Sequence, residues 1–456
     1  MLLRVIYAVI LGILCAPSTA RPIIDLGYAQ YNRVVDTTTN ITAYLGIRYA
    51  AAPGTCVQST PVAPDCRRRP EGLHTTKSML SGSDGDLHDQ STKSSCSSLS
   101  RDLGGLPIPQ VWKAYRSPHS QPSSGFTAEG AFVISLDEPG INSLRYLVVA
   151  ASMYDGGDLI AQSNRGIVVV TIQYSLGVFG FLSGTQVKEK GAFNAGLLGQ
   201  DFALRWVNQH ISKFGGDPSR VTIWGVLAST LVSLPVIKIV SLGIVGAGSV
   251  LQHVVANDGN TSPQLFRATI TNSTFLPSQY SYNDRIPELL YSEVVAQTNC
   301  SMATDSMACL RMVDANTLEN ANLHIAAAAF YGTFVFVSVV NGLFITQRPT
   351  LSLTQGNEAL LSVTNQFEGT NFVNQSNTAL ANATKYALHV FPNFGAARAD
   401  AVGMAYADLG TPLFQTNAVQ GKCVSEVLSI QRLLRSFSHI YLANVLCTPR
   451  LSWPFF

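Results

Sequence analysis

Charge is scarce in this sequence, and the two signs nearly cancel. Charged residues make up 13% of the 456 residues, and 30 Lys and Arg against 28 Asp and Glu leave a formal charge of +2. A nucleic-acid-binding protein needs a basic patch or tail, and this balance supplies no electrostatic footprint of that kind. We therefore expect no nucleic-acid partner and no acidic tail. The sequence also predicts no cofactor and no metal ion.

The chain begins with an apolar run that is too short to span a membrane. Residues 1–20 carry one early positive charge at Arg4, an apolar run from Val5 to Cys15, and small residues up to Ala20. A bilayer span needs about 20 apolar residues, and this layout is typical of a cleaved secretory signal peptide. We therefore predict a secreted, extracellular protein with no stable membrane span.

The cysteines of the mature chain cannot all pair with one another. Cys15 leaves with the signal peptide, and seven of the eight cysteines remain. These are Cys56, Cys66, Cys96, Cys300, Cys309, Cys423 and Cys447. An odd count in an oxidising compartment leaves one thiol free or paired between chains, which raises a question about the integrity of the sequence.

Sequons for N-glycosylation agree with secretion. They lie at Asn40, Asn260, Asn272, Asn299, Asn374 and Asn382. The pattern Asn-X-Ser/Thr also arises by chance, so we use these sites as support for a secreted glycoprotein and as nothing more.

The first third of the chain contains two segments of different composition. Residues 22–53 read as a strand-rich start. Residues 54–130 are rich in Ser, Gly, Pro and Asp and show no apolar period of 2 or 3.6 residues. This second stretch is therefore expected to be loop or disorder.

Regular structure is predicted from residue 166 onward. The run GIVVVTIQYS is typical of a strand buried on both faces of a parallel sheet. A helix follows, with Leu204, Val207 and Ile211 at helical spacing, and VTIWG at 221–225 reads as a second strand. Strand, helix and strand form a right-handed βαβ unit, and we expect the two strands to be neighbours in a parallel sheet. The predicted class is α/β, with a mostly parallel sheet and helices on both faces.

Two later segments continue this alternation. FRATITNS, from residue 266, reads as another strand, and PELLYSEVVAQTNC, from residue 287, reads as a helix. Both agree with a doubly wound arrangement.

Several segments of the chain together resemble the type-B carboxylesterases and lipases, the cholinesterase-like branch of the α/β hydrolases. The matching stretches are YLGIRYAAAP, GIVVVTIQYSLGVFGFLSG, NAGLLGQDFALRWVNQHISKFGGDPSRVTIWG, GAGSVLQHVVAN, NCSMATDSMACLR and QFEGTNFVNQS. They follow the order of the family, and the block from FGGDP to VTIWG is the most specific. The resemblance implies one α/β-hydrolase domain over residues 21–456, matched poorly at 54–130 and incomplete at its C-terminal end.

The resemblance also implies a reaction and some of its residues. Members of this family hydrolyse carboxylic esters, either small molecules or lipids, by acyl transfer through a serine. Glu368 matches the acid of the family's catalytic triad, which holds the histidine in the right tautomer. Cys300 and Cys309 match a family disulfide, which in the chain-entropy model contributes roughly 2 to 3 kcal/mol.

The serine of that reaction is missing from its expected place. The family reads Glu-Ser-Ala-Gly after VTIWG, forming a strand–turn–helix elbow G-x-S-x-G. Here Leu227 stands at the serine position, and no serine of the chain has glycine both two residues before and two after. Ser229 and Ser249 are the nearest candidates, and both are best interpreted as ordinary loop or helix serines.

Residues 226–245 form an anomalous insertion at this point. Replacing them by three residues would join VTIWG to GAGSVLQH in the family's register. A membrane span is one interpretation, but Pro235 and Lys238 lie at its centre, where a lysine costs about 2.5 to 3.5 kcal/mol. A buried extra segment is a second. We favour a third, sequence of non-coding origin such as an unspliced intron.

Two further parts of the catalytic apparatus are not found. The family's oxyanion loop, His-Gly-Gly-Gly, is replaced by PGINSLRYLVV. The nearby DGGDL, Asp155 to Leu159, is interpreted as a surface turn. The histidine context of the family never appears in the C-terminal tail, where His439 is the only histidine. His210, His253, His324 and His389 are interpreted as structural.

The sequence therefore favours a secreted carboxylic ester hydrolase whose given form is impaired or inactive. The three missing parts are separate blocks between well-matched flanks, which is unlike gradual decay. The alternative is a non-catalytic, cholinesterase-like binding or adhesion protein.

Overall fold

The computed structural model describes the chain mainly between residues 156 and 352, with shorter pieces on either side. The described residues are 23–50, 113–116, 131–135, 156–172, 174–226, 246–272, 277–330, 333–352, 359–363, 383–407 and 440–443. The strands are β1 Ile23–Asp25, β2 Gln30–Asn32, β3 Val34–Asp36, β4 Ile41–Tyr44, β5 Lys113–Arg116, β6 Ala131–Ser135, β7 Ile167–Thr171, β8 Val221–Val226, β9 Ala268–Asn272, β10 Ala359–Val363 and β11 Ile440–Ala443.

The helices lie mainly after β7 in the chain. They are α3 Gly157–Gln162, α4 Gly177–Phe181, α5 Thr185–Lys190, α6 Ala195–His210, α7 Gly246–Val255, α8 Arg285–Gln297, α9 Ser306–Met312, α10 Ala315–Ala328, α11 Pro349–Ser352, α12 Ala383–Val390 and α13 Ala396–Ala407. Short 3-10 turns follow at η1 Ile211–Phe214, η2 Pro218–Arg220 and η3 Ala256–Gly259.

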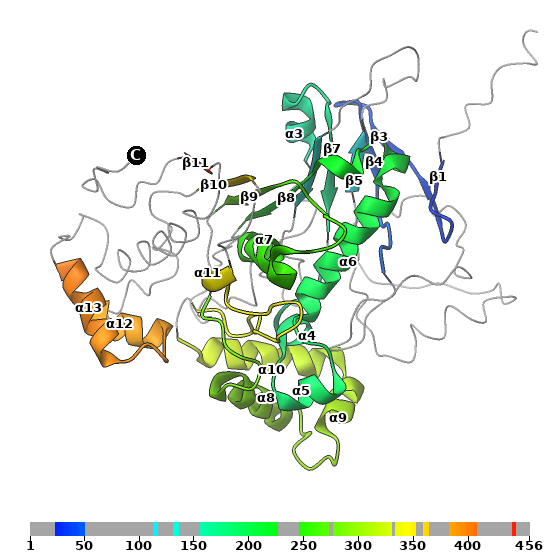
Figure 1. Ribbon diagram of the computed structural model, residues 1–456. Helices are drawn as coiled ribbons and strands as arrows, with labels where there is room; N and C mark the ends of the chain where they lie inside the picture. The colour runs from blue at the N-terminus through cyan, green and yellow to red at the C-terminus, as the bar shows by residue number, and fades with distance from the viewer. Residues whose placement is uncertain are drawn as a thin grey trace, which may run out of the picture.

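One large sheet organises the described part of the chain (Figure 1). Its order is β11-β10-β9-β8-β6-β7-β5-β4-β3, and β1 pairs with β2 in a separate antiparallel ribbon. Neighbouring strands from β11 to β7 are parallel, whereas β5, β4 and β3 continue the sheet antiparallel. The predicted α/β class with a mostly parallel sheet is confirmed.

Two expectations about the strands were wrong. The strands at 166–175 and 221–225 are not direct neighbours, because β6 pairs in parallel with β7 on one side and with β8 on the other. The stretch 54–130 also contains a strand, β5, which pairs with β4 and β7. Four residues are too few to show a periodic pattern. The strand forms because it pairs with segments far away in the sequence, which the local pattern does not reveal.

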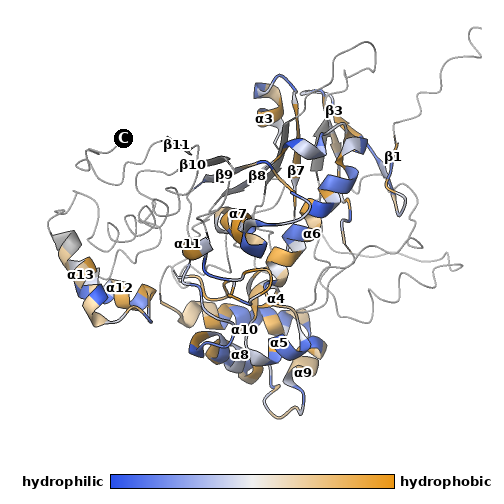
Figure 2. Cartoon of the chain, in the orientation of Figure 1, coloured by the Kyte–Doolittle hydropathy of each residue, from blue (hydrophilic) through white to orange (hydrophobic). Residues whose placement is uncertain are grey.

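The core forms where the apolar pattern predicts it. Val168, Val169 and Val170 of β7 are all buried, as the continuous β-branched run indicates for a two-sided strand. Leu204 and Val207 of α6 are also fully buried. Figure 2 shows both hydrophobic and hydrophilic residues along α6, whereas α7 is coloured mainly as hydrophobic.

Helix α7 is buried along its whole length. All its residues from Gly246 to Val255 are buried, and the helix contacts β8, β9 and α6. A helix that is covered on every side has no solvent-facing stripe to fix its rotation. Its polar side chains therefore need partners inside the protein.

A second group of helices, α4, α5, α8, α9 and α10, lies together at the bottom of Figure 1. Aspartates begin three of them: the side chains of Asp284, Asp305 and Asp314 accept backbone N–H groups at the starts of α8, α9 and α10. Such caps satisfy donors that a helix cannot pair internally. This explains why these helices start where they do.

Candidate active site

The tip of β8 lies in contact with the start of α7. Gly225 is the last residue but one of β8, and α7 begins at Gly246. A Cβ atom on Gly225 would lie 2.2 Å from the carbonyl carbon of Gly246, so only glycine fits at this point. The strand therefore meets the helix directly, although residues 227–245 lie between them in the chain.

A strand end in contact with a helix start is the arrangement that a nucleophile elbow requires. In open α/β sheets, ligands bind at the carboxyl ends of the parallel strands, and this contact lies at that edge. Val226, the first residue of the predicted insertion, is still part of β8 and pairs with Asn272. Leu227, Ser229, Glu368 and His439 lie outside the described residues.

Ser249 lies within α7 and is fully buried. Its Oγ accepts a hydrogen bond of 3.2 Å from the side-chain amide of Gln200 on α6. A nucleophile must reach a substrate carbonyl, and a serine enclosed in the middle of a buried helix cannot. The position of Ser249 agrees with the interpretation of it as a helix serine.

Gln200 connects two residues of α7 at once. Its Nε2 atom donates to Ser249, and its Oε1 atom lies 2.9 Å from Nε2 of His253. Ser249 and His253 are four residues apart and so lie on the same face of the helix. All three side chains are buried, with exposed fractions of 0% for Gln200, 0% for Ser249 and 4% for His253. The amide therefore satisfies both polar groups inside the core.

His253 is not placed to act as a catalytic base. Burial lowers its pKa to about 4, and the nearby charge of Asp201 only partly opposes this. The imidazole is therefore neutral at pH 7, and its ring packs edge-on against Phe344 with the ring centroids 5.9 Å apart. Its role is structural, as the sequence predicts.

Helix α7 has a second amide contact, at Gln252. Gln252 is buried, and its Oε1 atom accepts from Nε2 of Gln279 at 3.3 Å. The same Nε2 atom lies 2.9 Å from Oγ of Ser338. These bonds join α7 to the segment after β9 and to the segment 333–340.

Comparison with known proteins identifies the scaffold that carries this contact. Residues 141–394 match the family described as the Carboxylesterase family. The chain belongs to this family. The solved structure of EstA from Aspergillus niger superposes with a TM-score of 0.66 at 25% identity, covering 93% of this chain and 77% of that one.

Two relatives of this carboxylesterase-family chain are named as a lipase and a carboxylesterase. "Secreted lipase 1" of Botryotinia fuckeliana is 33% identical over 216 residues, which are 46% of this chain and 35% of that protein. "Carboxylesterase patB" of Aspergillus clavatus is 28% identical over 376 residues, which are 74% of this chain and 62% of that protein. The chain thus spans less than two thirds of the length of these relatives.

The segment DGGDL is not the surface turn that we expected. Gly156 has a left-handed backbone with φ of 66°, and Gly157 to Leu159 form the first turn of α3. A Cβ atom on Gly156 would lie 2.6 Å from a methyl group of Val169. Gly156 is therefore required for packing the start of α3 closely against β7. Asp155 lies outside the described residues.

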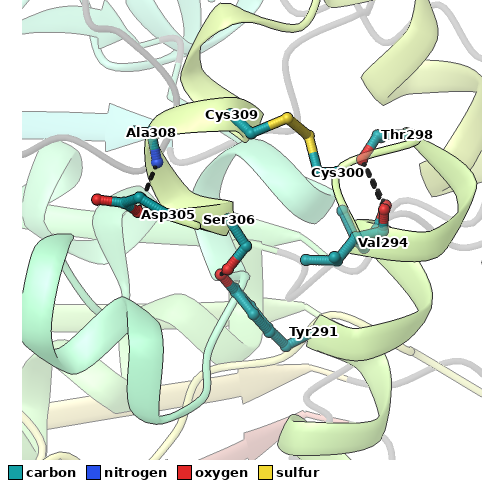
Figure 3. Close-up of a disulfide and its surroundings, with 9 residues drawn as sticks. Tyr291, Val294, Thr298, Cys300, Asp305, Ser306, Ala308 and Cys309 are labelled. Atoms are coloured by element: carbon teal, nitrogen blue, oxygen red, sulfur yellow. Dashed lines mark hydrogen bonds between the residues drawn. A yellow bond between two sulfur atoms is a disulfide. The ribbon is translucent and has the colours of Figure 1, made fainter. Parts of the chain in front are cut away.

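The disulfide implied by the family resemblance is confirmed. Cys300 and Cys309 are bonded, with their Cα atoms 5.8 Å apart, and the bond joins the end of α8 to α9 (Figure 3). The other histidines that the sequence analysis interprets as structural all lie in helices. His210 lies at the end of α6, His324 in α10 and His389 in α12.

The predicted glycosylation sites differ in their accessibility. Asn260 and Asn299 are exposed. Asn40 is half-buried, and its carbonyl accepts from Arg165. Asn272 ends β9, and its side-chain oxygen accepts from the indole of Trp224 at 3.2 Å. Asn374 and Asn382 lie outside the described residues.

A metal-binding cluster and a membrane-spanning helix are both absent from the described segments. Among those residues, no three His, Cys, Asp or Glu side chains gather closely enough to hold a metal ion. No helix within the same segments has the length and apolar character for crossing a membrane.

Proposed function

We propose that this chain is a form of a secreted carboxylic ester hydrolase, in which the catalytic apparatus is impaired. The observation that carries the proposal is the contact between Gly225 and Gly246. It preserves the strand-to-helix junction of a hydrolase, while the residue that follows Val226 is Leu227, which has no nucleophilic atom.

The family reaction needs a serine hydroxyl and a histidine base. The serine oxygen attacks the ester carbonyl carbon while the histidine takes its proton, and an oxyanion site stabilises the charge that develops. Ser249 is buried and bonded to Gln200, and His253 is neutral and bonded to the same amide. Neither can replace the missing groups. The loss of a triad serine or histidine lowers kcat by about 10⁶, and the loss of one oxyanion donor by about 10² to 10³.

The substrate class of the intact enzyme follows from the family. We expect small-molecule or lipid carboxylic esters, with Glu368 as the acid that would orient a histidine. The predicted signal peptide at 1–20 and the exposed sequons at Asn260 and Asn299 support passage through the secretory pathway.

The test is hydrolysis of p-nitrophenyl butyrate by the purified chain, with EstA from Aspergillus niger as the active reference. We expect no turnover above a buffer control and no labelling by a fluorophosphonate probe. Robust turnover, with the label mapped to Ser229 or Ser249, would contradict the proposal.

A second experiment addresses the origin of residues 226–245. The mature transcript is amplified across codons 225–246 and sequenced. Our proposal expects a message that encodes Glu-Ser-Ala between Gly225 and Gly246. If every transcript instead encodes the segment as given, an unspliced intron is excluded.

The second candidate is a binding protein without catalysis. The complete packing of α7 supports it. The polar side chains of this helix, which are Ser249, Gln252 and His253, all have hydrogen-bonding partners. The helix can therefore be stable without a reactive serine in front of it. A secreted monomer with a cooperative thermal transition would favour this candidate. Aggregation of the purified chain would favour an impaired hydrolase.

A further inference from the structure

The sequon at Asn299 overlaps the disulfide. Its three residues are Asn299, Cys300 and Ser301, so the middle residue of the glycosylation signal is a bridged cysteine. Among the exposed sequons described, Asn260 has no such neighbour, because its triad continues with Thr261 and Ser262.

The backbone of the sequon is folded into the end of α8. Asn299 has φ of 59°, a left-handed conformation that asparagine tolerates better than most residues. Its N–H donates to the carbonyl of Ala296, and the N–H of Cys300 donates to the carbonyl of Val295. This pair of bonds is the Schellman motif, in which a left-handed residue ends a helix. The backbone of Asn299 therefore ends α8, while its side chain is exposed to solvent.

The loop closed by the disulfide is held from several sides. Cys300 is fully buried, Tyr291 of α8 contacts the hydroxyl of Ser306 at 2.6 Å, and Asp305 caps α9 through Ala308 (Figure 3). Asp305 also forms an ion pair of 3.0 Å with Lys190. Once this loop is closed, the backbone between Asn299 and Ser301 cannot extend without breaking the cap.

We propose that N-glycosylation of Asn299 and closure of the Cys300–Cys309 disulfide are competing fates of the same segment. A glycosyl transferase must bind the asparagine amide together with the hydroxyl two residues later, which requires a free backbone between them. In the folded segment, the hydrogen bonds at the end of α8 and the disulfide fix that backbone, so it is not free to bind the enzyme. Asn299 is therefore modified only on chains whose Cys300 is still a thiol.

Glycosylation of Asn299 and closure of the disulfide each consume a reagent from outside the chain. In glycosylation, Nδ2 of Asn299 bonds to the anomeric carbon of a lipid-linked sugar diphosphate, the diphosphate leaves, and the amide loses one proton. In closure, the thiols of Cys300 and Cys309 lose two protons and two electrons to a disulfide-containing oxidant, which is reduced to two thiols. Both reagents belong to the oxidising secretory compartment.

The test is the glycan occupancy of Asn299, measured by peptide mass spectrometry after enzymatic glycan release in heavy-oxygen water. The full chain is secreted from a eukaryotic host, as given and as Cys309→Ser, which keeps the sequon but removes the bridge. We expect low occupancy in the parent and a rise in Cys309→Ser toward the level at Asn260. Cys423→Ser is the control for losing a cysteine elsewhere, and Ser301→Ala for losing the sequon.

A second measurement does not depend on secretion of the variant. The parent chain is translated into microsomes with and without dithiothreitol, which keeps Cys300 reduced. We expect the reductant to raise occupancy at Asn299 and to leave Asn260 unchanged. Equal occupancy of Asn299 with and without the bridge, or no glycan at Asn299 under reducing conditions, would overturn the proposal.

Discussion

The Nε2 atom of His253 lies 2.9 Å from Oε1 of Gln200, and both side chains are buried between α6 and α7. Because the amide oxygen can only accept, the imidazole donates from Nε2. The pair joins the helix that follows the elbow position to the helix that precedes β8. The imidazole of His253 can take up a proton, whereas the amide of Gln200 cannot.

Acidification is expected to destabilise the protein through His253. The native pKa is about 4 and the ordinary value is 6.5, so the unfolded chain binds more protons between these values. Stability contributed by neutral His253 is complete above pH 6.5 and is lost as the pH falls toward 4, by about 3 kcal/mol. Urea unfolding across this range measures it. His253→Gln, which cannot titrate, should show a flatter profile, and parallel profiles would contradict the assignment.

Removing the amide of Gln200 should destabilise the contact between α6 and α7. Gln200→Leu leaves the buried Oγ of Ser249 and Nε2 of His253 without this partner, which costs about 2 kcal/mol or more. A double-mutant cycle with Ser249→Ala separates the bond from general packing. We expect the two substitutions to be non-additive by about 0.5 kcal/mol or more, and simple additivity would argue against the bridge.

A methyl group at Gly225 should disrupt the junction between β8 and α7. The added Cβ would lie 2.2 Å from backbone atoms of Gly246, which cannot rotate away as a side chain would. We expect Gly225→Ala to lower the free energy of unfolding by about 1 to 3 kcal/mol. Gly166→Ala is the control, because its nearest atom would be 3.1 Å away. Equal effects would mean that the junction is looser than the structure shows.

Loss of the disulfide should lower thermal stability. Cys309→Ala opens a short loop, and the chain-entropy model gives a loss of about 2 to 3 kcal/mol. Thermal unfolding with and without reductant measures this loss. Reductant should destabilise the parent chain and have a smaller effect on the variant; an unchanged parent would show that the bridge contributes little.

Local patterns in the sequence were sufficient for much of the fold. The β-branched run of β7 and the helical spacing of α6 both predict burial, and Val170 and Leu204 are fully buried. The place of β6 between β7 and β8 could not be predicted in this way. Strand order depends on pairings between distant segments. The residues Ala131–Ser135 contain no pattern that indicates which strands they pair with.

The candidate site was predictable in outline but not in its supporting contacts. Gly225 and Gly246 could be matched by register, and the structure brings their backbones together. The bridge through Gln200 was missed, because a glutamine in a helix usually lies in solvent. A signal existed: Ser249, Gln252 and His253 are polar residues within an otherwise apolar helix, which indicates internal hydrogen-bonding partners.

The position of β6 also bears on how the polypeptide is completed during synthesis. β6 leaves the ribosome before both of its neighbours, and its second edge stays open until Val221 to Trp224 have been made. Deletion of Ala131–Ser135 would leave β7 and β8 each with one unpaired edge in the middle of the sheet. Exposed edges of that kind are templates for pairing between chains. Removal of these five residues is therefore expected to make the chain prone to aggregation.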